Sequence, residues 1–214
     1  MKITVNHIGV IGAYTNVAIR CPHCGHQGTF VHLGNDILES NRLVLGQRRC
    51  PNEKCKGHIF FISENNKDVI RTYPGDTIPF ETTGIPSRIL DAFTEAITCH
   101  ANNCFIAAAI MIRKTLEEIC SHESSSGKNL KDRLKELGGK ITIPKELIEG
   151  MDELRLLGND AAHIEANTFE EIGKDEIEIS IEFTKEILKA TYQYEDLLAK
   201  LRSLKKPPVV VNTP

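Results

Sequence analysis

Two short cysteine pairs decide how the first third of the chain folds, Cys21-Pro22-His23-Cys24-Gly25 and Cys50-Pro51-Asn52-Glu53-Lys54-Cys55. In the first pair the turn allows two sulfurs to grip one ion while backbone amides point at the thiolates. The second pair encloses four residues instead of two, and this wider loop still permits chelation. Together the pairs predict one structural Zn²⁺ site, whose four ligands are Cys21, Cys24, Cys50 and Cys55.

A closed set of four thiolates leaves no open position for water, which favours a structural ion over a catalytic one. Another metal, or cysteines that bind no metal, are the alternatives. Three nearby histidines could also replace a cysteine, although a histidine beside four thiols is more often a surface residue; they are His23, His26 and His58. The remaining three of the seven cysteines are scattered, so a disulfide framework is not expected.

The chain divides into two parts of different composition. Strands are expected at residues 29–33, 43–45 and 57–62, around the cysteines, where few apolar residues are available and a bound metal would supply folding energy. Residues 73–86 are rich in Pro, Gly and Thr and indicate a linker. We therefore expect a zinc-ribbon domain with its linker at residues 1–84, a helical domain at 85–206 and an extended tail at 207–214.

Helical periodicity begins directly after the linker. Helices are expected at residues 87–97, 104–120 and 129–137, the last of them ended by Gly138-Gly139. Pro144 suits the first turn of a further helix, and a long amphipathic helix is expected at about 174–204. The predicted fold class is α+β, with a small β zinc ribbon followed by an up-down bundle of four or five helices.

The net charge of −3 conceals two opposite balances. Residues 1–84 carry 9 Lys/Arg against 7 Asp/Glu, whereas residues 85–214 carry 17 against 22. Basic residues near the cysteines make a candidate nucleic-acid-binding surface, for which we select Arg42, Arg48 and Arg49. Zinc with four thiolates contributes about −2, however, and offsets most of the local positive excess.

No segment of the sequence suggests a membrane protein. The longest apolar run, residues 104–112, is far shorter than the roughly 20 residues of a membrane-spanning helix. The first residues lack the charged start and apolar stretch of a signal peptide. We expect a cytoplasmic protein without a membrane partner.

A polar constellation lies in the segment 151–163. At about 100° per residue, Leu157, Ala161 and Ile164 fall on the same apolar stripe as Leu154. On the same helix, Arg155, Asn159 and His163 fall on a separate polar face. An imidazole can exchange a proton, a guanidinium can neutralise phosphorane charge and an amide can orient either group, so these three are candidate catalytic residues. The alternative is an exposed helix face with incidental polar residues.

Arg113 and Glu117 stand four residues apart and can form an ion pair. Their order is the less favourable one for the helix dipole, so local helix stability explains the pair poorly. They are either an ordinary surface pair or supporting residues that tie helices together around the face of Arg155 and His163.

The order of these features resembles the bacterial "domain of unknown function 4145" family, which is grouped with the HEPN superfamily of helical bundles. The resemblance rests on the Cys-x-x-Cys ribbon, Tyr73-Pro74, the Arg113-x-x-x-Glu117 helix and the segment from Arg155 to His163. Many HEPN proteins are metal-independent endoribonucleases of toxin–antitoxin and antiviral defence systems.

The resemblance implies that Arg155 and His163 act in RNA cleavage at the interface of a homodimer, leaving a 2′,3′-cyclic phosphate. It also implies a defence-system protein as a possible partner. The alternative is a non-catalytic zinc-ribbon adaptor, which binds nucleic acid or a partner protein and dimerises through its helical bundle.

Overall fold

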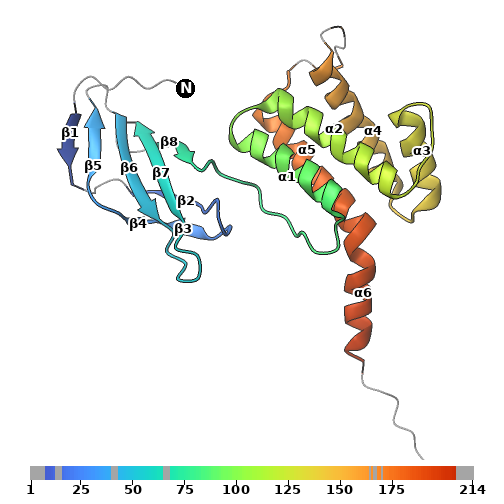
Figure 1. Ribbon diagram of the computed structural model, residues 1–214, viewed down its shortest axis with the longest axis horizontal. Coiled ribbons are helices and arrows are strands. Elements are labelled where there is room, and N and C mark those ends of the chain that lie inside the picture. The colour runs from blue at the N-terminus through green and yellow to red at the C-terminus, as the bar shows by residue number, and fades with distance from the viewer. Residues whose placement is uncertain are drawn as a thin grey trace, which may run out of the picture. The chain divides into compact units, whose positions relative to one another are not determined.

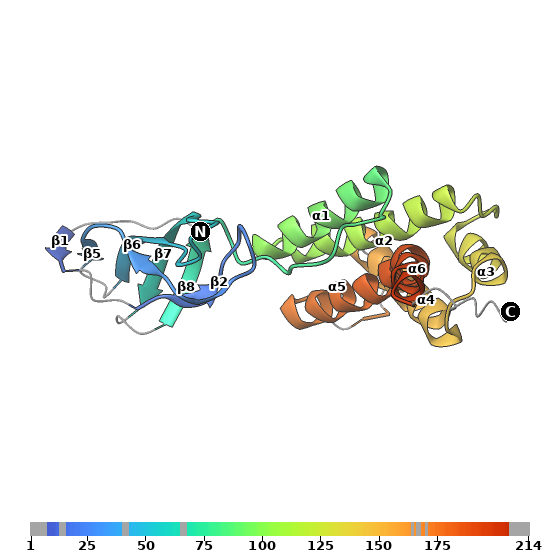
Figure 2. The same ribbon diagram turned by 90° about the horizontal axis from the view of Figure 1, so that it is seen from below.

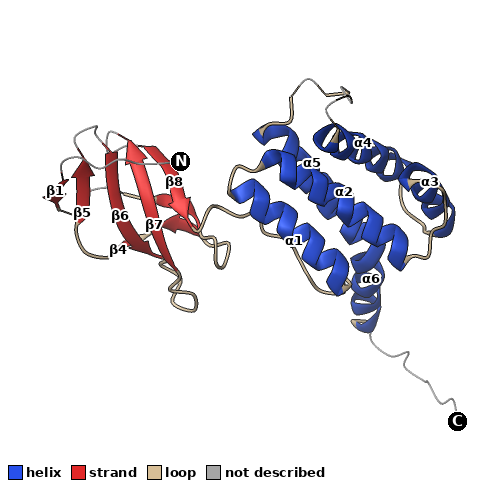
Figure 3. Cartoon of the chain, turned by 45° about the horizontal axis from the view of Figure 1, so that its top comes forward, coloured by secondary structure: helices blue, strands red, loops and turns tan. Residues whose placement is uncertain are grey.

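The chain folds into a strand-rich unit, Met1–Pro79, and a helical unit, Phe80–Pro214 (Figures 1 and 3). The computed structural model describes residues 8–12, 16–39, 43–64, 68–163, 165, 168–169 and 171–205. The units divide a few residues before the position at which the sequence predicted the boundary. The predicted tail at 207–214 lies outside the described residues.

Short antiparallel strands build the N-terminal unit. They are β1 (Ile8–Ile11), β2 (Ala18–Arg20), β3 (Gln27–Thr29), β4 (Val31–His32), β5 (Asp36–Glu39), β6 (Leu43–Arg49), β7 (His58–Glu64) and β8 (Asp68–Tyr73). The larger sheet has the order β1-β5-β6-β7-β8, with β4 paired to the end of β6, while β2 and β3 form a separate hairpin. The strand expected at 29–33 is divided between β3 and β4, and Phe30 between them is buried in the core.

The core of this unit is small. Its buried apolar residues come from β6, β7 and the positions that flank β2, β3 and β6, and they include two cysteines: Val17, Cys21, Phe30, Val44, Cys50, Ile59 and Phe61. A core of this size supplies limited folding energy, which agrees with the expectation that the unit needs a bound metal.

Helices build the second unit and confirm the predicted α+β class. They are α1 (Ser87–Ala101), α2 (Phe105–His122), α3 (Leu130–Lys140), α4 (Lys145–Ala162), α5 (Lys174–Leu188), the π-helical segment η1 (Lys189–Gln193) and α6 (Tyr194–Ser203). Helix α4 begins at Lys145, directly after the predicted position, and Pro144 is its N-cap. None of the described helices is long and apolar enough to cross a membrane.

The prediction that Gly138-Gly139 ends the third helix was wrong. Helix α3 continues through both glycines to Lys140, and Ile141 then turns extended. Gly138 packs against the side chain of Ile148 in α4, so tertiary contact outweighs the helix-breaking tendency of glycine.

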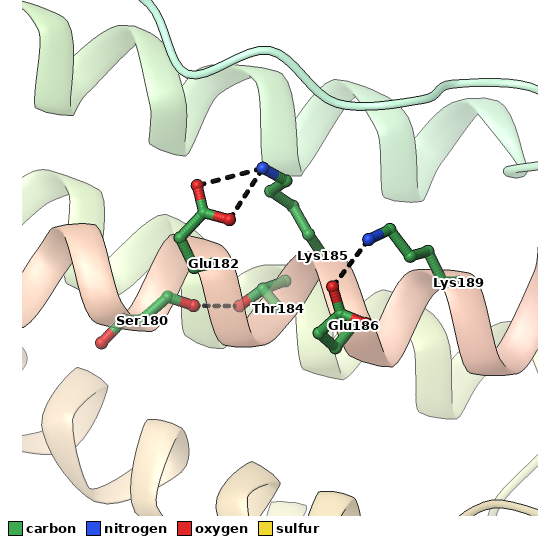
Figure 4. Close-up of polar contacts among 6 residues, drawn as sticks. All are labelled: Ser180, Glu182, Thr184, Lys185, Glu186 and Lys189. Atoms are coloured by element: carbon green, nitrogen blue, oxygen red, sulfur yellow. Dashed lines mark hydrogen bonds and ion pairs between the residues drawn. The ribbon is translucent and has the colours of Figure 1, made fainter.

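Buried apolar side chains from α1, α2, α4 and α5 form the core of the helical unit. Figure 2 shows these helices from a second direction. Two buried hydroxyls on α5 donate to carbonyls of the preceding helical turn: Ser180 to Glu176, and Thr184 to Ser180. Figure 4 shows the second of these hydrogen bonds. Within α5, Lys185 forms an ion pair with Glu182, and Glu186 pairs with Lys189, the first residue of η1 (Figure 4). The expected long C-terminal helix is present as α5, η1 and α6 in direct succession.

Candidate functional site

The four predicted cysteine ligands lie together in the N-terminal unit. The Sγ atoms of Cys21, Cys24, Cys50 and Cys55 are all within 4.8 Å of one another. Sγ of Cys21 is 3.9 Å from Sγ of Cys55, and Sγ of Cys24 is 3.8 Å from Sγ of Cys50. A tetrahedral ion with metal–sulfur bonds of about 2.3 Å requires sulfur–sulfur distances of about 3.8 Å. The cluster therefore has the dimensions to hold a metal ion.

Two turns of matching construction present these sulfurs, one between β2 and β3 and the other between β6 and β7. The amide of His23 donates to Cys21 Sγ at 3.4 Å, and the amide of Gly57 donates to Cys55 Sγ at 3.3 Å. In the same way, the backbone amide of His26 donates to the sulfur of Cys24, and that of Asn52 donates to the sulfur of Cys50. Each sulfur thus accepts an amide hydrogen from the residue two positions later, which stabilises a thiolate.

The extra residues of the second pair leave this geometry intact. The residue after each second cysteine adopts a left-handed backbone, with φ of 72° at Gly25 and 51° at Lys56. The amide of Cys21 donates to the His26 carbonyl at 2.8 Å, and that of Cys50 donates to the Gly57 carbonyl at 2.8 Å. The wider loop therefore closes at the same kind of hydrogen bond as the narrow one.

The environments of the cysteines differ, since Cys21 and Cys50 are buried whereas Cys24 is exposed. The hydrogen bond from the His26 amide lowers the pKa of Cys24 to about 7. Burial raises the pKa of Cys50 to about 12. A coordinated cation would favour the thiolate at both positions.

Histidine does not belong to this cluster among the described residues. Nε2 of His23 lies 2.9 Å from the carbonyl oxygen of His58, so the ring of His23 is engaged with the backbone of the other turn. The donor set is therefore four sulfurs, a set that suits soft or borderline metals such as Zn²⁺.

The predicted basic surface requires a correction at Arg48. Both Arg48 and Asp36 have fully buried side chains, which form two hydrogen bonds of 2.7 Å. The guanidinium of Arg48 also lies over the ring of Phe61, 4.5 Å from its centroid. Arg48 thus stabilises the interior and is removed from any surface that nucleic acid could reach. Arg42 lies outside the described residues.

Arg49 is placed on the other face of the sheet, because successive residues of a strand point to opposite sides. The ladder sets Arg49 opposite His58, and it sets Phe60 opposite both Gln47 and Tyr73. Two residues before Tyr73 on β8, and therefore on the same face, Arg71 is opposite Ile62. We call this set the aromatic face: Arg49, Gln47, His58, Phe60, Arg71 and Tyr73.

Large rings are unusually exposed on the aromatic face. Phe60 is 51% exposed and Tyr73 is 42% exposed. The ring of His58 stacks on Phe60 with centroids 5.1 Å apart, and Arg71 lies 5.5 Å from the Tyr73 centroid. These rings were not among the residues selected from the sequence, because the adjacent phenylalanines of His58-Ile59-Phe60-Phe61 give no sign of which ring is exposed.

The helical unit uses Arg113 as a link between helices. Nη1 of Arg113 donates to Asn159 Oδ1 at 2.6 Å and to the carbonyl of Arg155 at 3.5 Å. Nε of Arg113 is 3.4 Å from the carboxylate of Glu117. Arg113 therefore ties α2 to α4, whereas Glu117 pairs with Arg113 within α2 itself.

The three candidate catalytic residues are not brought together by hydrogen bonds. Nε of Arg155 is 2.6 Å from Asp152 Oδ1, and the Arg155 side chain is only 12% exposed. Asn159 is held by Arg113, while His163 is exposed. The helix continues through Gly158 but ends at Ala162, and His163 has the extended backbone of a C-cap. His163 therefore leaves the helical face on which the periodicity placed it.

Two further residues of this segment, Gly158 and Asp160, have structural contacts. Gly158 packs against the side chain of Arg113 and the carbonyl of Ala109, so it allows α2 and α4 to approach closely. The carboxylate of Asp160 accepts hydrogen bonds from the amides of Thr168 and Phe169 beyond the helix. Of the predicted apolar stripe, Leu157 is buried and Ala161 is half-buried, whereas Ile164 lies outside the described residues.

Comparison with known proteins identifies the helical unit. The family model described as "Domain of unknown function (DUF4145)" matches residues 94–206, from within α1 to the end of α6 and just beyond. Searches of curated proteins and of solved structures found no match. Since the matched segment covers more than half of the 214 residues, the chain belongs to the DUF4145 family.

Proposed function

We propose that the chain is a non-catalytic nucleic-acid-binding adaptor, and that its aromatic face binds single-stranded nucleic acid. The observation that carries this proposal is the exposed pair of Phe60 and Tyr73, flanked by Arg49 and Arg71. Bases stack on exposed aromatic rings, and arginines contact the phosphates between them. The named residues of the aromatic face include no carboxylate that would repel phosphate.

The role of the metal in this proposal is structural. Zn²⁺ held by Cys21, Cys24, Cys50 and Cys55 would join the β2–β3 turn to the β6–β7 turn. Strand β6 ends and β7 begins at the second of these turns, and the two strands carry Arg49, His58 and Phe60. The metal would therefore hold the aromatic face in its folded geometry without contacting the nucleic acid.

Fluorescence anisotropy with labelled oligo(U) and oligo(dT) of about 15 nucleotides tests the proposal. Phe60→Ala or Tyr73→Ala removes the ring on which one base would stack and should weaken binding about ten-fold. Arg49→Glu, which removes a phosphate contact, should also weaken binding. Val10→Ala, which truncates an exposed apolar residue of the same sheet, is the matched control. Absence of binding by the wild type at low salt would exclude this function. Wild-type affinity in the Phe60→Ala and Tyr73→Ala variants would exclude it as well. A preference for oligo(U) would identify RNA as the ligand.

A second candidate function is metal-independent RNA cleavage by the helical unit. The observation in its favour is His163, whose exposed side chain follows directly after α4 and is accessible for proton exchange. Against it stand the contacts of Arg155 with Asp152 and of Asn159 with Arg113. For cleavage, His163 would need a basic side chain beside it to neutralise the phosphate, either from a second copy of the chain or from Arg155 in another side-chain conformation.

The nuclease assay uses labelled RNA and zinc-loaded protein, with no further divalent cation added. RNA cleavage that disappears in His163→Ala and persists in His122→Ala would establish this second function. His122 is the matched control because it is also an exposed histidine near a helix terminus. Cleavage that persists in His163→Ala would show that His163 has no catalytic role.

A further inference from the structure

Helix α6 carries an apolar stripe on the surface of the helical unit. Five large side chains of the helix and its C-cap are between 44% and 78% exposed: Tyr194, Leu197, Leu198, Leu201 and, at the C-cap, Leu204. No residue of α6 is buried. At about 100° per residue, these five side chains fall within an arc of about 120°, which is the width of a helix–helix contact surface.

No helix of the same unit covers this stripe in the described part of the chain. Helix α6 follows η1 and extends beyond the packed helices of its unit (Figure 1). The linker segment lies along part of one side of α6, where Glu81 and Thr83 line a depression together with Asp196, Leu197 and Lys200. An amphipathic helix with an uncovered leucine stripe is typical of a surface that pairs with another helix.

The charges of α6 are sorted along its length. Glu195 and Asp196 lie in its first turn, whereas Lys200 and Arg202 lie in its last turns. The same geometry of about 100° per residue puts Glu195 and Arg202 on one flank of the stripe, and Asp196 and Lys200 on the other. Each flank thus has a negative charge at its N-terminal end and a positive charge at its C-terminal end.

We propose that α6 pairs antiparallel with α6 of a second copy of the chain. In an antiparallel pair, like flanks face each other across a two-fold axis. Glu195 then faces the partner's Arg202, and Asp196 faces the partner's Lys200. Both contacts occur twice because the interface is isologous, so the pattern of charges is complementary to itself.

A parallel pair would have the opposite electrostatics. Unlike flanks face each other in a parallel pair, so the acidic residues of both copies meet at one end and the basic residues at the other. The resulting like-charge contacts disfavour that arrangement. The charge pattern therefore selects a second copy as the occupant and also selects its orientation.

The length of the helix limits the strength of this pairing. Helix α6 has 10 residues and spans only about 15 Å, so two such stripes bury less than the roughly 1,000 Å² of a stable interface. We therefore expect a concentration-dependent dimer with a dissociation constant of about 1–100 μM. This inference concerns only the helical unit and is independent of nucleic-acid binding.

Sedimentation equilibrium of the zinc-loaded full chain tests the pairing. The wild type should change from monomer to dimer over about 1–200 μM, and Leu198→Glu/Leu201→Glu should be monomeric throughout this range. Ile179→Glu is the matched control, because Ile179 is 70% exposed on α5 and lies outside the stripe. Circular dichroism confirms that each variant is folded. A wild type that stays monomeric, or a dimer that survives the double leucine substitution, would overturn the proposal.

Single charge reversals test the orientation. Glu195→Lys should weaken an antiparallel dimer by about five-fold, since the new lysine faces the partner's Arg202. The further substitution Arg202→Glu should restore the affinity. Glu146→Lys, a charge reversal at an exposed residue of α4, should leave the dimer affinity unchanged. Tighter association of Glu195→Lys would instead indicate a parallel pair and would overturn the antiparallel arrangement.

Discussion

Arg113 and Asn159 join α2 to α4 through a hydrogen bond of 2.6 Å between Nη1 and Oδ1. Arg113 also contacts the carbonyl of Arg155 and the carboxylate of Glu117. The part of α4 that suggested catalysis from its sequence is therefore also a structural connection. Two of its distinctive residues, Gly158 and Asn159, are accounted for by contact with α2.

We expect Asn159→Ala to destabilise the helical unit by about 1–3 kcal/mol, because it removes the partner of a partly buried guanidinium. Arg113→Ala should have a similar effect. A double-mutant cycle measured by urea unfolding should give a coupling energy of at least about 1 kcal/mol. Lys114→Ala, which breaks the neighbouring pair of an exposed lysine with Glu118, should cost less than about 1 kcal/mol. Additive effects of the Arg113 and Asn159 substitutions would show that the contact contributes nothing.

Two glycines in helices should respond in opposite ways to alanine. A Cβ atom at Gly158 would lie 2.5 Å from Cβ of Arg113, so we expect Gly158→Ala to destabilise the unit by about 1–3 kcal/mol through overpacking. At Gly139, no atom of the described residues beyond the adjoining helical backbone lies within 4 Å of the added Cβ atom. Gly139→Ala should therefore stabilise α3 by up to about 1 kcal/mol, since alanine has the higher helix propensity. Thermal unfolding of both variants tests this, and a stabilised Gly158→Ala would contradict the close approach of α2 and α4.

Features set by neighbouring residues could be predicted from the sequence. The cysteine pairs identified the metal cluster because each turn is local and both turns carry the same chemistry. Pro144 marked the start of α4 for a similar reason, since proline suits a first helical turn regardless of distant contacts.

Features set by distant contacts could not be predicted in this way. Arg48 and Arg49 are adjacent and chemically identical, and only the register with β7 decides which of them faces the core. Helix α3 passes through Gly138 because Ile148 packs on it, and α4 ends before His163. None of these outcomes follows from the periodicity of a single segment.

Removal of the metal should unfold the N-terminal unit and leave the helical unit folded. The small core of the first unit depends on the ligands Cys21 and Cys50, which are themselves buried in it. We expect one Zn²⁺ per chain by elemental analysis, and a chelator should abolish the β-sheet signals in a two-dimensional NMR spectrum. Cys50→Ser should reproduce this loss, whereas Cys120→Ser, a buried thiol of the helical unit, should retain the metal. A native spectrum in metal-free protein would show that the cluster has no structural role.

The adjacent arginines of β6 offer a matched pair of substitutions. Arg48→Ala leaves Asp36 buried without its cation, and we expect a loss of about 3–5 kcal/mol in the unfolding free energy of the N-terminal unit. Arg49→Ala should cost less than about 1 kcal/mol, because its half-buried side chain lies on the outer face. Hydrogen exchange of the β6 and β7 amides measures both effects within the same sheet. Equal protection in the two variants would contradict the assignment of Arg48 to the interior, and with it the assignment of Arg49 to the aromatic face.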